Sequence, residues 1–162
     1  MMVFPGWAYE VMIEVQGEAV SRIELVAAPS SGNRAKESEG GGSLARTLER
    51  DLARYFSGEQ VSFLNYPVEL SGLPVFSRQV LEAARRIPYG ERCSYGELAR
   101  AVGRPGAARA VGQVLHRNPL PIIVPCHRVV GADGGLRGFA GGVELKRRLL
   151  ELEHSGCAGG GE

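Results

Sequence analysis

The most restrictive feature of the sequence is the segment 118–130, NPLPIIVPCHRVV. Three prolines fall within its first eight residues, so the segment cannot form a regular helix. The aliphatic residues 122–124 must be buried, and Pro125 then fixes the backbone immediately before Cys126. We therefore expect a sheltered cysteine that is held in one orientation.

Two interpretations of Cys126 follow from its neighbours. A cysteine among aliphatic residues is most often an inert part of a core. The adjoining His127 favours a nucleophile instead, because the thiolate is the reactive form and a histidine can accept the thiol proton. Adjacent side chains of an extended segment point to opposite faces, so proton transfer from Cys126 to His127 would need a turn or a bridging water.

The charge of the chain is divided unevenly along its length. Residues 1–75 carry 6 Lys and Arg against 10 Asp and Glu, a net charge of −4, whereas residues 76–162 carry 13 against 8, a net charge of +5. This asymmetry suggests that only the second half meets a polyanion such as a nucleic acid.

Composition excludes several other classes of protein. The apolar stretches are far shorter than a membrane span, and the N-terminus carries no secretory signal. The three cysteines, at positions 93, 126 and 157, lack the C-x-x-C spacing that is typical of zinc sites and are too few for a disulfide framework. We expect a reduced, cytoplasmic setting.

The first half is predicted to be a small α/β unit without a catalytic constellation. Two β-like runs, at 12–15 and 20–26, are separated by the turn-like Gly17-Glu18. The glycine-rich stretch 32–42 indicates a loop, after which Ser43 can cap a helix with the apolar face Leu44, Leu48, Leu52, Tyr55 and Phe56.

The second half is predicted to be mainly helical. A connector at 66–74 leads to a helix at about 74–87, and Ser94 and Glu97 have the spacing of a capping box for a second helix. The turn 103–106 then leads into a third helix over 107–117. A helix, a tight turn and a helix in the basic half are typical of a helix-turn-helix, although a plain helical hairpin fits the spacing equally well.

The third helix has one polar face, formed by Arg109, Gln113, His116 and Arg117. Small residues surround Arg109: Ala107, Ala108, Ala110 and Gly112. They would let the helix backbone lie close to a nucleic-acid groove, with one long cationic side chain projecting from it. Close packing against another helix is the alternative explanation.

The segment PCHRVV at 125–130 resembles the active-site signature of the O6-alkylguanine-DNA alkyltransferases, or methylated-DNA–protein-cysteine methyltransferases. Supporting blocks lie on both sides in the order and spacing of that family: SYGELA at 94–99, ARAVG at 108–112, Asn118-Pro119, GFAGG at 138–142 and a closing helix with Lys146 and Glu153. They cover roughly residues 76–154. The first half is similar only in size and in its strand-then-helix outline.

The resemblance implies direct, single-turnover DNA repair. Cys126 would take an alkyl group from O6 of guanine, or from O4 of thymine, and keep it as a stable thioether. His127 would accept the Cys126 proton through a water, Glu153 would hold and polarise His127, and Asn118 would brace the active-site segment. The partner would be double-stranded DNA containing O6-alkylguanine.

The same resemblance implies that the damaged nucleotide is flipped out of the duplex. Arg109 would fill the vacated space, and Tyr95 would press the flanking phosphate and bind the base. The other implied DNA-binding residues are Ala108, Gly112 and Gln113, and the implied pocket residues are Leu115, Val129, Phe139 and Ala140. Arg92, Arg104 and Arg117 are candidate phosphate neighbours, and Arg128 is interpreted as a structural tie between the two halves.

No cofactor and no metal are implied. Some relatives carry a zinc site in the first half, but here no Cys or His precedes Cys93. Ala140 stands where some members carry a hydroxyl residue, so the preference among alkyl groups can differ.

The implied fold is an RNase H-like α/β domain at 1–70, followed by a mainly α domain at 71–154 with a helix-turn-helix of winged-helix type. A flexible tail is expected at 155–162, and the chain is expected to be a monomer. Three rival functions were considered: a non-catalytic sensor of alkylated DNA, a transcription regulator switched by alkylation of Cys126, and a Cys–His hydrolase. The sensor is disfavoured because Cys126 is present, the regulator because a further DNA-binding domain is missing, and the hydrolase because no oxyanion site is identified.

Overall fold

The first half of the chain forms a small antiparallel sheet in the computed structural model, which describes residues 2–3, 7, 9–27, 42–136 and 142–159. The sheet has the order β1 (Met2–Val3), β2 (Tyr9–Gln16), β3 (Ala19–Ala27). Gly17 turns the chain between β2 and β3 with a φ of 62°, which glycine adopts without strain. The two predicted strands are confirmed and are longer than predicted. The predicted loop 32–42 lies, apart from Gly42, outside the described residues.

Helix α1 (Ser43–Phe56) packs on β2 and β3. Its buried face includes Leu48, Leu52 and Tyr55, each 0% exposed. The prediction that Ser43 caps this helix is wrong: Gly42 occupies the N-cap position, Ser43 is already the first helical residue, and no side chain described there makes a capping hydrogen bond. The apolar face of α1 packs against the sheet.

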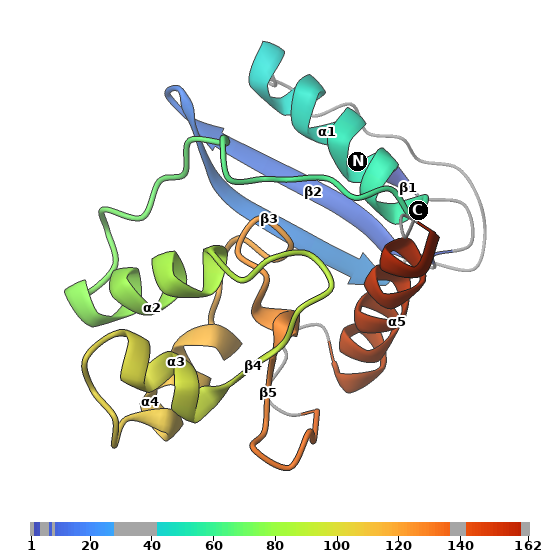
Figure 1. Cartoon of the computed structure of the whole chain (residues 1–162). Helices are drawn as coiled ribbons and strands as arrows, with labels where there is room; N and C mark the ends of the chain where they lie inside the picture. Colours follow the sequence, from blue (N-terminus) through green and yellow to red (C-terminus); the bar gives the residue numbers. More distant parts are fainter. Residues whose placement is uncertain (1, 4–6, 8, 28–41, 137–141, 160–162) are drawn as a thin grey trace.

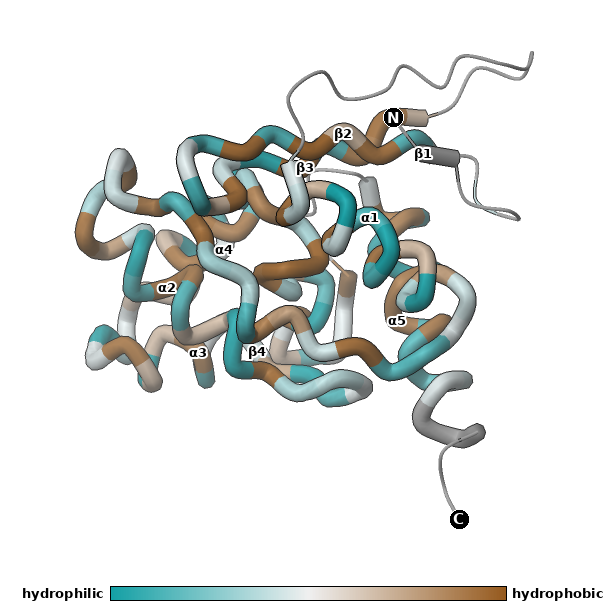
Figure 2. The backbone as a smooth tube through the Cα atoms, turned by 90° about the horizontal axis from the view of Figure 1, so that it is seen from above, coloured by the Kyte–Doolittle hydropathy of each residue, from teal (hydrophilic) through white to brown (hydrophobic). Residues whose placement is uncertain are grey.

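Three helices of the second half form a separate group. Helices α2 (Val75–Arg85), α3 (Tyr95–Ala101) and α4 (Ala108–His116) contact one another and lie at the opposite end of the molecule from α1 and α5 (Figures 1 and 2). The predicted capping box is confirmed, because Glu97 N donates to Ser94 Oγ at 3.0 Å and Ser94 N donates to Glu97 Oε2 at 3.2 Å. The cap starts α3 at Tyr95, which fixes the position of that side chain beside α4.

The proline-rich segment crosses the core between α4 and α5. Ile122 and Ile123 are 2% exposed and Val124 is 0% exposed, which confirms the predicted burial. Residues Cys126–Arg128 form a single 3₁₀ turn (η1), so of the two open possibilities, an extended backbone or a turn, the structure has the turn. Strand β5 (Val129–Val130) follows and pairs in parallel with β4 (Cys93–Ser94).

Helix α5 (Val143–Gly159) closes the described chain. It continues to Gly159, so residues 155–159 are helical, whereas a tail was expected from 155; residues 160–162 lie outside the described part. One continuous hydrophobic core includes side chains of both halves, among them Val20, Leu52, Leu81 and Leu149. No helix within the described ranges is long and apolar enough to cross a membrane.

Candidate active site

Cys126 is held in a buried turn that several backbone hydrogen bonds define. Its side chain is 5% exposed, its N–H donates to Val124 O at 2.8 Å, and Arg128 N donates to Pro125 O at 3.0 Å. Asn118 braces the segment that leads into the turn: its Nδ2 donates to Val124 O at 3.0 Å. The thiol is therefore sheltered and oriented.

Asn118 makes a second bond to the same segment, because its Oδ1 accepts from Leu120 N at 2.9 Å. Both ends of its amide are thus used within one loop, and the side chain itself is 9% exposed. An apolar residue at this position would leave a buried N–H and a buried carbonyl without these partners.

His127 and Glu153 form a fully buried pair. His127 Nε2 and Glu153 Oε1 are 2.7 Å apart, and the two side chains are 0% and 1% exposed. A carboxylate accepts hydrogen bonds only, so Nε2 carries the proton of a neutral His127 ring. The other ring nitrogen, Nδ1, is buried and has no hydrogen-bond partner among the described residues. His127 thus keeps one basic nitrogen available.

The pKa values in this site have clear physical causes. Burial raises the pKa of the Cys126 thiol to about 11, with Asn118 and Lys146 acting in the opposite direction. Burial also lowers the pKa of His127. Burial opposes ionisation of Glu153, but hydrogen bonds and charges from His127 and Arg128 outweigh it and hold its pKa at about 2. The resting site therefore contains a thiol, a neutral imidazole and a carboxylate.

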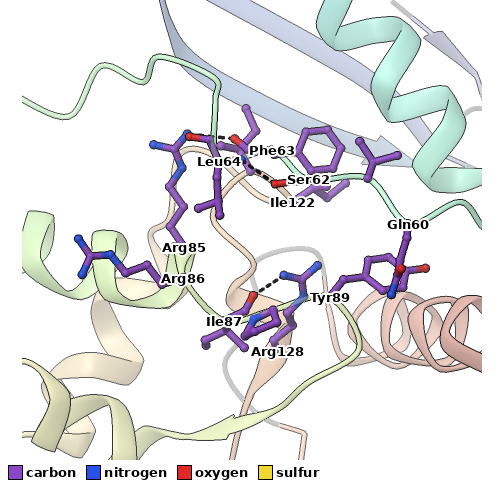
Figure 3. A pocket seen from close by; sticks show the side chains of 13 residues that line it. Gln60, Ser62, Phe63, Leu64, Arg85, Arg86, Ile87, Tyr89, Ile122 and Arg128 are labelled. Carbon is purple, nitrogen blue, oxygen red and sulfur yellow. Dashed lines mark hydrogen bonds between the residues drawn. The ribbon is translucent and has the colours of Figure 1, made fainter.

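Arg128 neutralises that carboxylate. Its Nε lies 3.0 Å from both oxygens of Glu153, and its Nη2 lies 2.7 Å from Oε1. Its Nη1 donates to Ile87 O at 2.6 Å beside the Tyr89 ring, at the edge of a cavity of about 420 Å³ (Figure 3). Its hydrogen-bond partners Glu153 and Ile87 both belong to the second half of the chain, and it meets the first half only through the Glu153 carboxylate that it shares with Tyr55 and at the cavity that residues 60–64 also line. The interpretation of Arg128 as a tie between the two halves stays a prediction.

The hydroxyl that reaches this site from the first half belongs to Tyr55 on α1. It donates to Glu153 Oε1 at 2.8 Å and lies 3.3 Å from His127 Nε2. From the sequence, Tyr55 is predicted only as a member of the apolar face of a helix. Nothing in the spacing of the first half signals a partner 98 residues further along the chain.

Lys146 is a second residue to which sequence reasoning assigned no role in the site. It is 1% exposed on α5, and burial lowers its pKa to about 8. Its Nζ donates to Tyr95 Oη at 3.3 Å and lies 5.6 Å from the centre of the Tyr95 ring. Lys146 thus connects the environment of Cys126, whose charge it feels, with the first residue of α3.

The outer face of α4 forms a hollow of about 560 Å³. The structure brings together in it the five residues predicted to bind DNA, together with two further members of the predicted polar face: Tyr95, Ala108, Arg109, Gly112 and Gln113, with His116 and Arg117. Among the described residues, no acidic side chain lines this hollow. A Cβ atom added at Gly112 would lie 3.7 Å from the Tyr95 ring, an ordinary van der Waals distance, which places the ring beside this position of α4.

The predicted pocket residues are only partly described. Leu115 is 2% exposed and Val129 is 0% exposed, so both side chains belong to the core behind the active-site turn. Phe139 and Ala140 lie outside the described residues. Within the described ranges, no group of three or more His, Cys, Asp and Glu side chains is arranged to hold a metal ion.

Comparison with known proteins gives consistent matches. Residues 75–155, half of the chain, match the family model described as 6-O-methylguanine DNA methyltransferase, DNA binding domain. The methylated-DNA–protein-cysteine methyltransferase of Mycobacterium bovis is 53% identical over 104 residues, which is 64% of this chain and 62% of that protein. The match therefore spans less than two thirds of that relative's length.

Two further matches extend into the first half. The protein of the same description from Haemophilus influenzae is 37% identical over 150 residues, covering 93% of this chain and 83% of that protein. The crystal structure of Mycobacterium tuberculosis OGT in complex with DNA superposes with a TM-score of 0.75 at 37% identity, covering 90% of this chain and 87% of that one. The chain shares their mixed α/β fold and belongs to the 6-O-methylguanine DNA methyltransferase family.

Proposed function

We propose that this chain repairs DNA directly by moving an alkyl group from O6 of guanine, or from O4 of thymine, to its own Cys126. The observation that carries the proposal is the buried Cys126 turn beside a neutral His127 whose Nδ1 is available and whose Nε2 is bound to Glu153. Such an arrangement generates a thiolate only when a proton acceptor and an electrophile are both in place.

The transfer is a single displacement. His127 takes the thiol proton through a bridging water, the sulfur attacks the alkyl carbon, an S–C bond forms and the C–O6 bond breaks. Guanine leaves with the electron pair and takes up a proton. The product is a thioether, which has no easy hydrolysis step, so each molecule acts once. Asn118 and Glu153 hold the turn and the imidazole, respectively, in the geometry that this step needs.

We assign DNA binding to the hollow on α4, with α3, the turn and α4 acting as a helix-turn-helix of winged-helix type. Arg109 is exposed on this face and has the length to enter a base stack and replace a flipped nucleotide. Ala108 and Gly112 keep the helix slender enough for a minor groove, and Gln113 extends the polar face. Tyr95 lies at the entrance, where it can contact a phosphate and the extruded base.

The extruded base is assigned a pocket between α4 and the turn of Cys126. As the resemblance implies, we assign Leu115 to its apolar floor and the Val129 N–H as a hydrogen-bond donor, which in this structure is bonded to Cys126 O. The resemblance adds Phe139 as a wall and the Ala140 N–H as a second donor. Since the position of Ala140 carries no hydroxyl, the backbone is the donor that remains there.

We assign residues 1–70 to an RNase H-like α/β domain and residues 71–154 to the DNA-binding and alkyl-acceptor domain, whose last helix α5 continues to Gly159. The proposed form is a monomer that acts on double-stranded DNA in the cytoplasm. The sheet of three strands covered by α1 supports the first assignment, and the basic face of α4 supports the second.

One incubation tests the proposed activity. The protein is mixed with a duplex that contains O6-methylguanine, and its peptides are examined by mass spectrometry. The peptide containing Cys126 is expected to gain one methyl group, unmodified guanine is expected to appear, and transfer is expected to stop at one equivalent. Cys126→Ser should abolish transfer, whereas Cys93→Ser should retain it. Multiple turnover, or DNA binding without transfer, would overturn the proposal.

A further inference from the structure

One oxygen of Glu153 serves four donors at once. Oε1 accepts from Tyr55 Oη at 2.8 Å, from His127 Nε2 at 2.7 Å, and from Arg128 Nε at 3.0 Å and Nη2 at 2.7 Å. A carboxylate oxygen has two lone pairs, so these donors share its negative charge. The charge that Glu153 presents to His127 is correspondingly smaller than it would be in an isolated pair.

The Tyr55 hydroxyl is a donor that the first half of the chain contributes to this site. The ring is 0% exposed and stands edge-on to Phe56, Phe63 and Tyr89, with ring centres 5.4, 5.9 and 6.1 Å away. These contacts require an aromatic ring but no hydroxyl. Burial and the charge of Glu153 raise the pKa of Tyr55 well above its usual value, so the hydroxyl keeps its proton and donates throughout the working pH range.

The charged groups around His127 act on its protonation in opposite directions. Arg128 and Lys146 are cationic, and both lower the pKa of His127. Tyr89 is a phenol that lies against Arg128, and Cys126 is a thiol at rest. Glu153 is the anion that favours the imidazolium ion, and its charge is shared with Tyr55 and Arg128.

We propose that Tyr55 is a positioning residue that holds the resting site in its neutral form. By donating to Glu153, the hydroxyl withholds part of the carboxylate charge from His127, so Cys126 stays a protonated thiol until a substrate is bound. The advantage of this restraint rests on the proposed function. A cysteine that accepts an alkyl group only once is inactivated when any other electrophile alkylates it. A thiol that stays protonated at rest reacts slowly with such electrophiles and remains available for alkylated DNA.

The test uses iodoacetamide as the probe on a background of Cys93→Ser and Cys157→Ser, so that Cys126 is the only thiol. The reaction forms an S–C bond, expels iodide and passes the thiol proton to His127. Tyr55→Phe keeps the ring and removes the hydroxyl. We expect its alkylation rate at pH 8 to rise about tenfold, the ratio that corresponds to one pKa unit. The acid limb of its rate profile should move to higher pH, because His127 becomes easier to protonate.

Two comparisons distinguish an electrostatic effect of the Tyr55 hydroxyl on the alkylation rate from a faster reaction caused by loosened packing around Cys126. Tyr66→Phe removes a hydroxyl that donates to Asp51, outside the site, and should leave the rate and the pH profile unchanged. In a His127→Gln background, Tyr55→Phe should produce no acceleration, because the effect passes through the imidazole; a loosened structure would still react faster there.

An unchanged or slower rate for Tyr55→Phe, or an acceleration that persists in the His127→Gln background, overturns the inference. Failure of the wild-type protein to take methyl groups from DNA would instead overturn the proposed function. The iodoacetamide comparison would keep its meaning in that case, since no DNA is present.

Discussion

Replacing Glu153 by Gln removes the charge at the centre of the site while keeping the size of the side chain. Arg128 then remains buried without a carboxylate partner, since its other polar contact is the neutral carbonyl of Ile87. His127 loses the ionised acceptor of its Nε2 proton. We expect a large loss of stability together with a loss of alkyl transfer.

The expected loss of stability can be calculated from the pKa of Glu153. That pKa lies at about 2 in the folded protein against an ordinary value of 4.5 for a glutamate. The difference corresponds to about 3 kcal/mol of stability at neutral pH. Breaking a buried ion pair by removing one partner costs about 3–5 kcal/mol in general, so two independent arguments give similar figures.

The pH dependence follows from the sign of the shift. Because the pKa of Glu153 is lower in the folded state, its contribution is fully present above the unfolded value of 4.5 and is lost as the pH falls toward about 2. The free energy of unfolding should therefore be measured in urea for wild type and Glu153→Gln at pH 7, 5, 4 and 3. The difference between the two proteins should be largest at pH 7 and should shrink below pH 5.

Glu144→Gln is a matched control on the same helix. Glu144 pairs with Arg147 at the surface, where its side chain is 64% exposed, so its replacement should cause no measurable change in stability. If Glu153→Gln is as stable as wild type at pH 7, or if the difference between them does not change with pH, the electrostatic account of this site is wrong.

Three further substitutions have expected outcomes. Asn118→Ala should lower the free energy of unfolding by about 1–3 kcal/mol in urea denaturation, because Leu120 N loses its acceptor and Val124 O loses one of two donors, retaining Cys126 N, and it should slow transfer in a single-turnover assay. Arg109→Ala should retain most of its affinity for undamaged duplex in a fluorescence titration but lose transfer, because a flipped base is no longer replaced in the stack. Gly156→Ala should lower the melting temperature in calorimetry, because the added Cβ atom would collide with the Tyr89 hydroxyl.

Each of these substitutions has a control. Asn118→Asp keeps the acceptor for Leu120 and should fall between wild type and the Ala variant in stability. Arg117→Ala removes a cation from the same hollow and should weaken DNA binding without a selective loss of transfer. Gly106→Ala meets no atom within 4 Å and should melt like wild type. Equal behaviour of a variant and its control would contradict the corresponding argument.

The features that depend on residues close together in the sequence could be predicted from short sequence patterns. The capping box at Ser94 needs two residues three positions apart, and both of its hydrogen bonds are present. The polar face of α4 follows from helical periodicity, and its members line one hollow. The burial of Ile122 and its neighbours follows from aliphatic side chains between prolines.

Other features could not be predicted from local patterns. For the backbone at Cys126 the sequence left a turn and an extended segment both open, and the hydrogen bond from Arg128 N to Pro125 O closes a 3₁₀ turn there. Ser43 has the chemistry of a cap, but Gly42 takes that position, and the burial of the α1 face is decided by the sheet. Tyr55 looked like any aromatic residue on an apolar face, since its partner is set by the packing of α1 near α5.

The residues of the active site lie far apart in the sequence, and this has a consequence during protein synthesis. Tyr55, the Cys126 turn and Glu153 are brought together across 98 residues, so no shorter stretch of the growing chain contains them all. A ribosome adds roughly 5–20 residues per second, and a nascent chain therefore presents its cysteine for seconds before the base and its carboxylate can assemble. An interrupted translation product that ends before α5 would carry the acceptor thiol but would lack the carboxylate partner of its base.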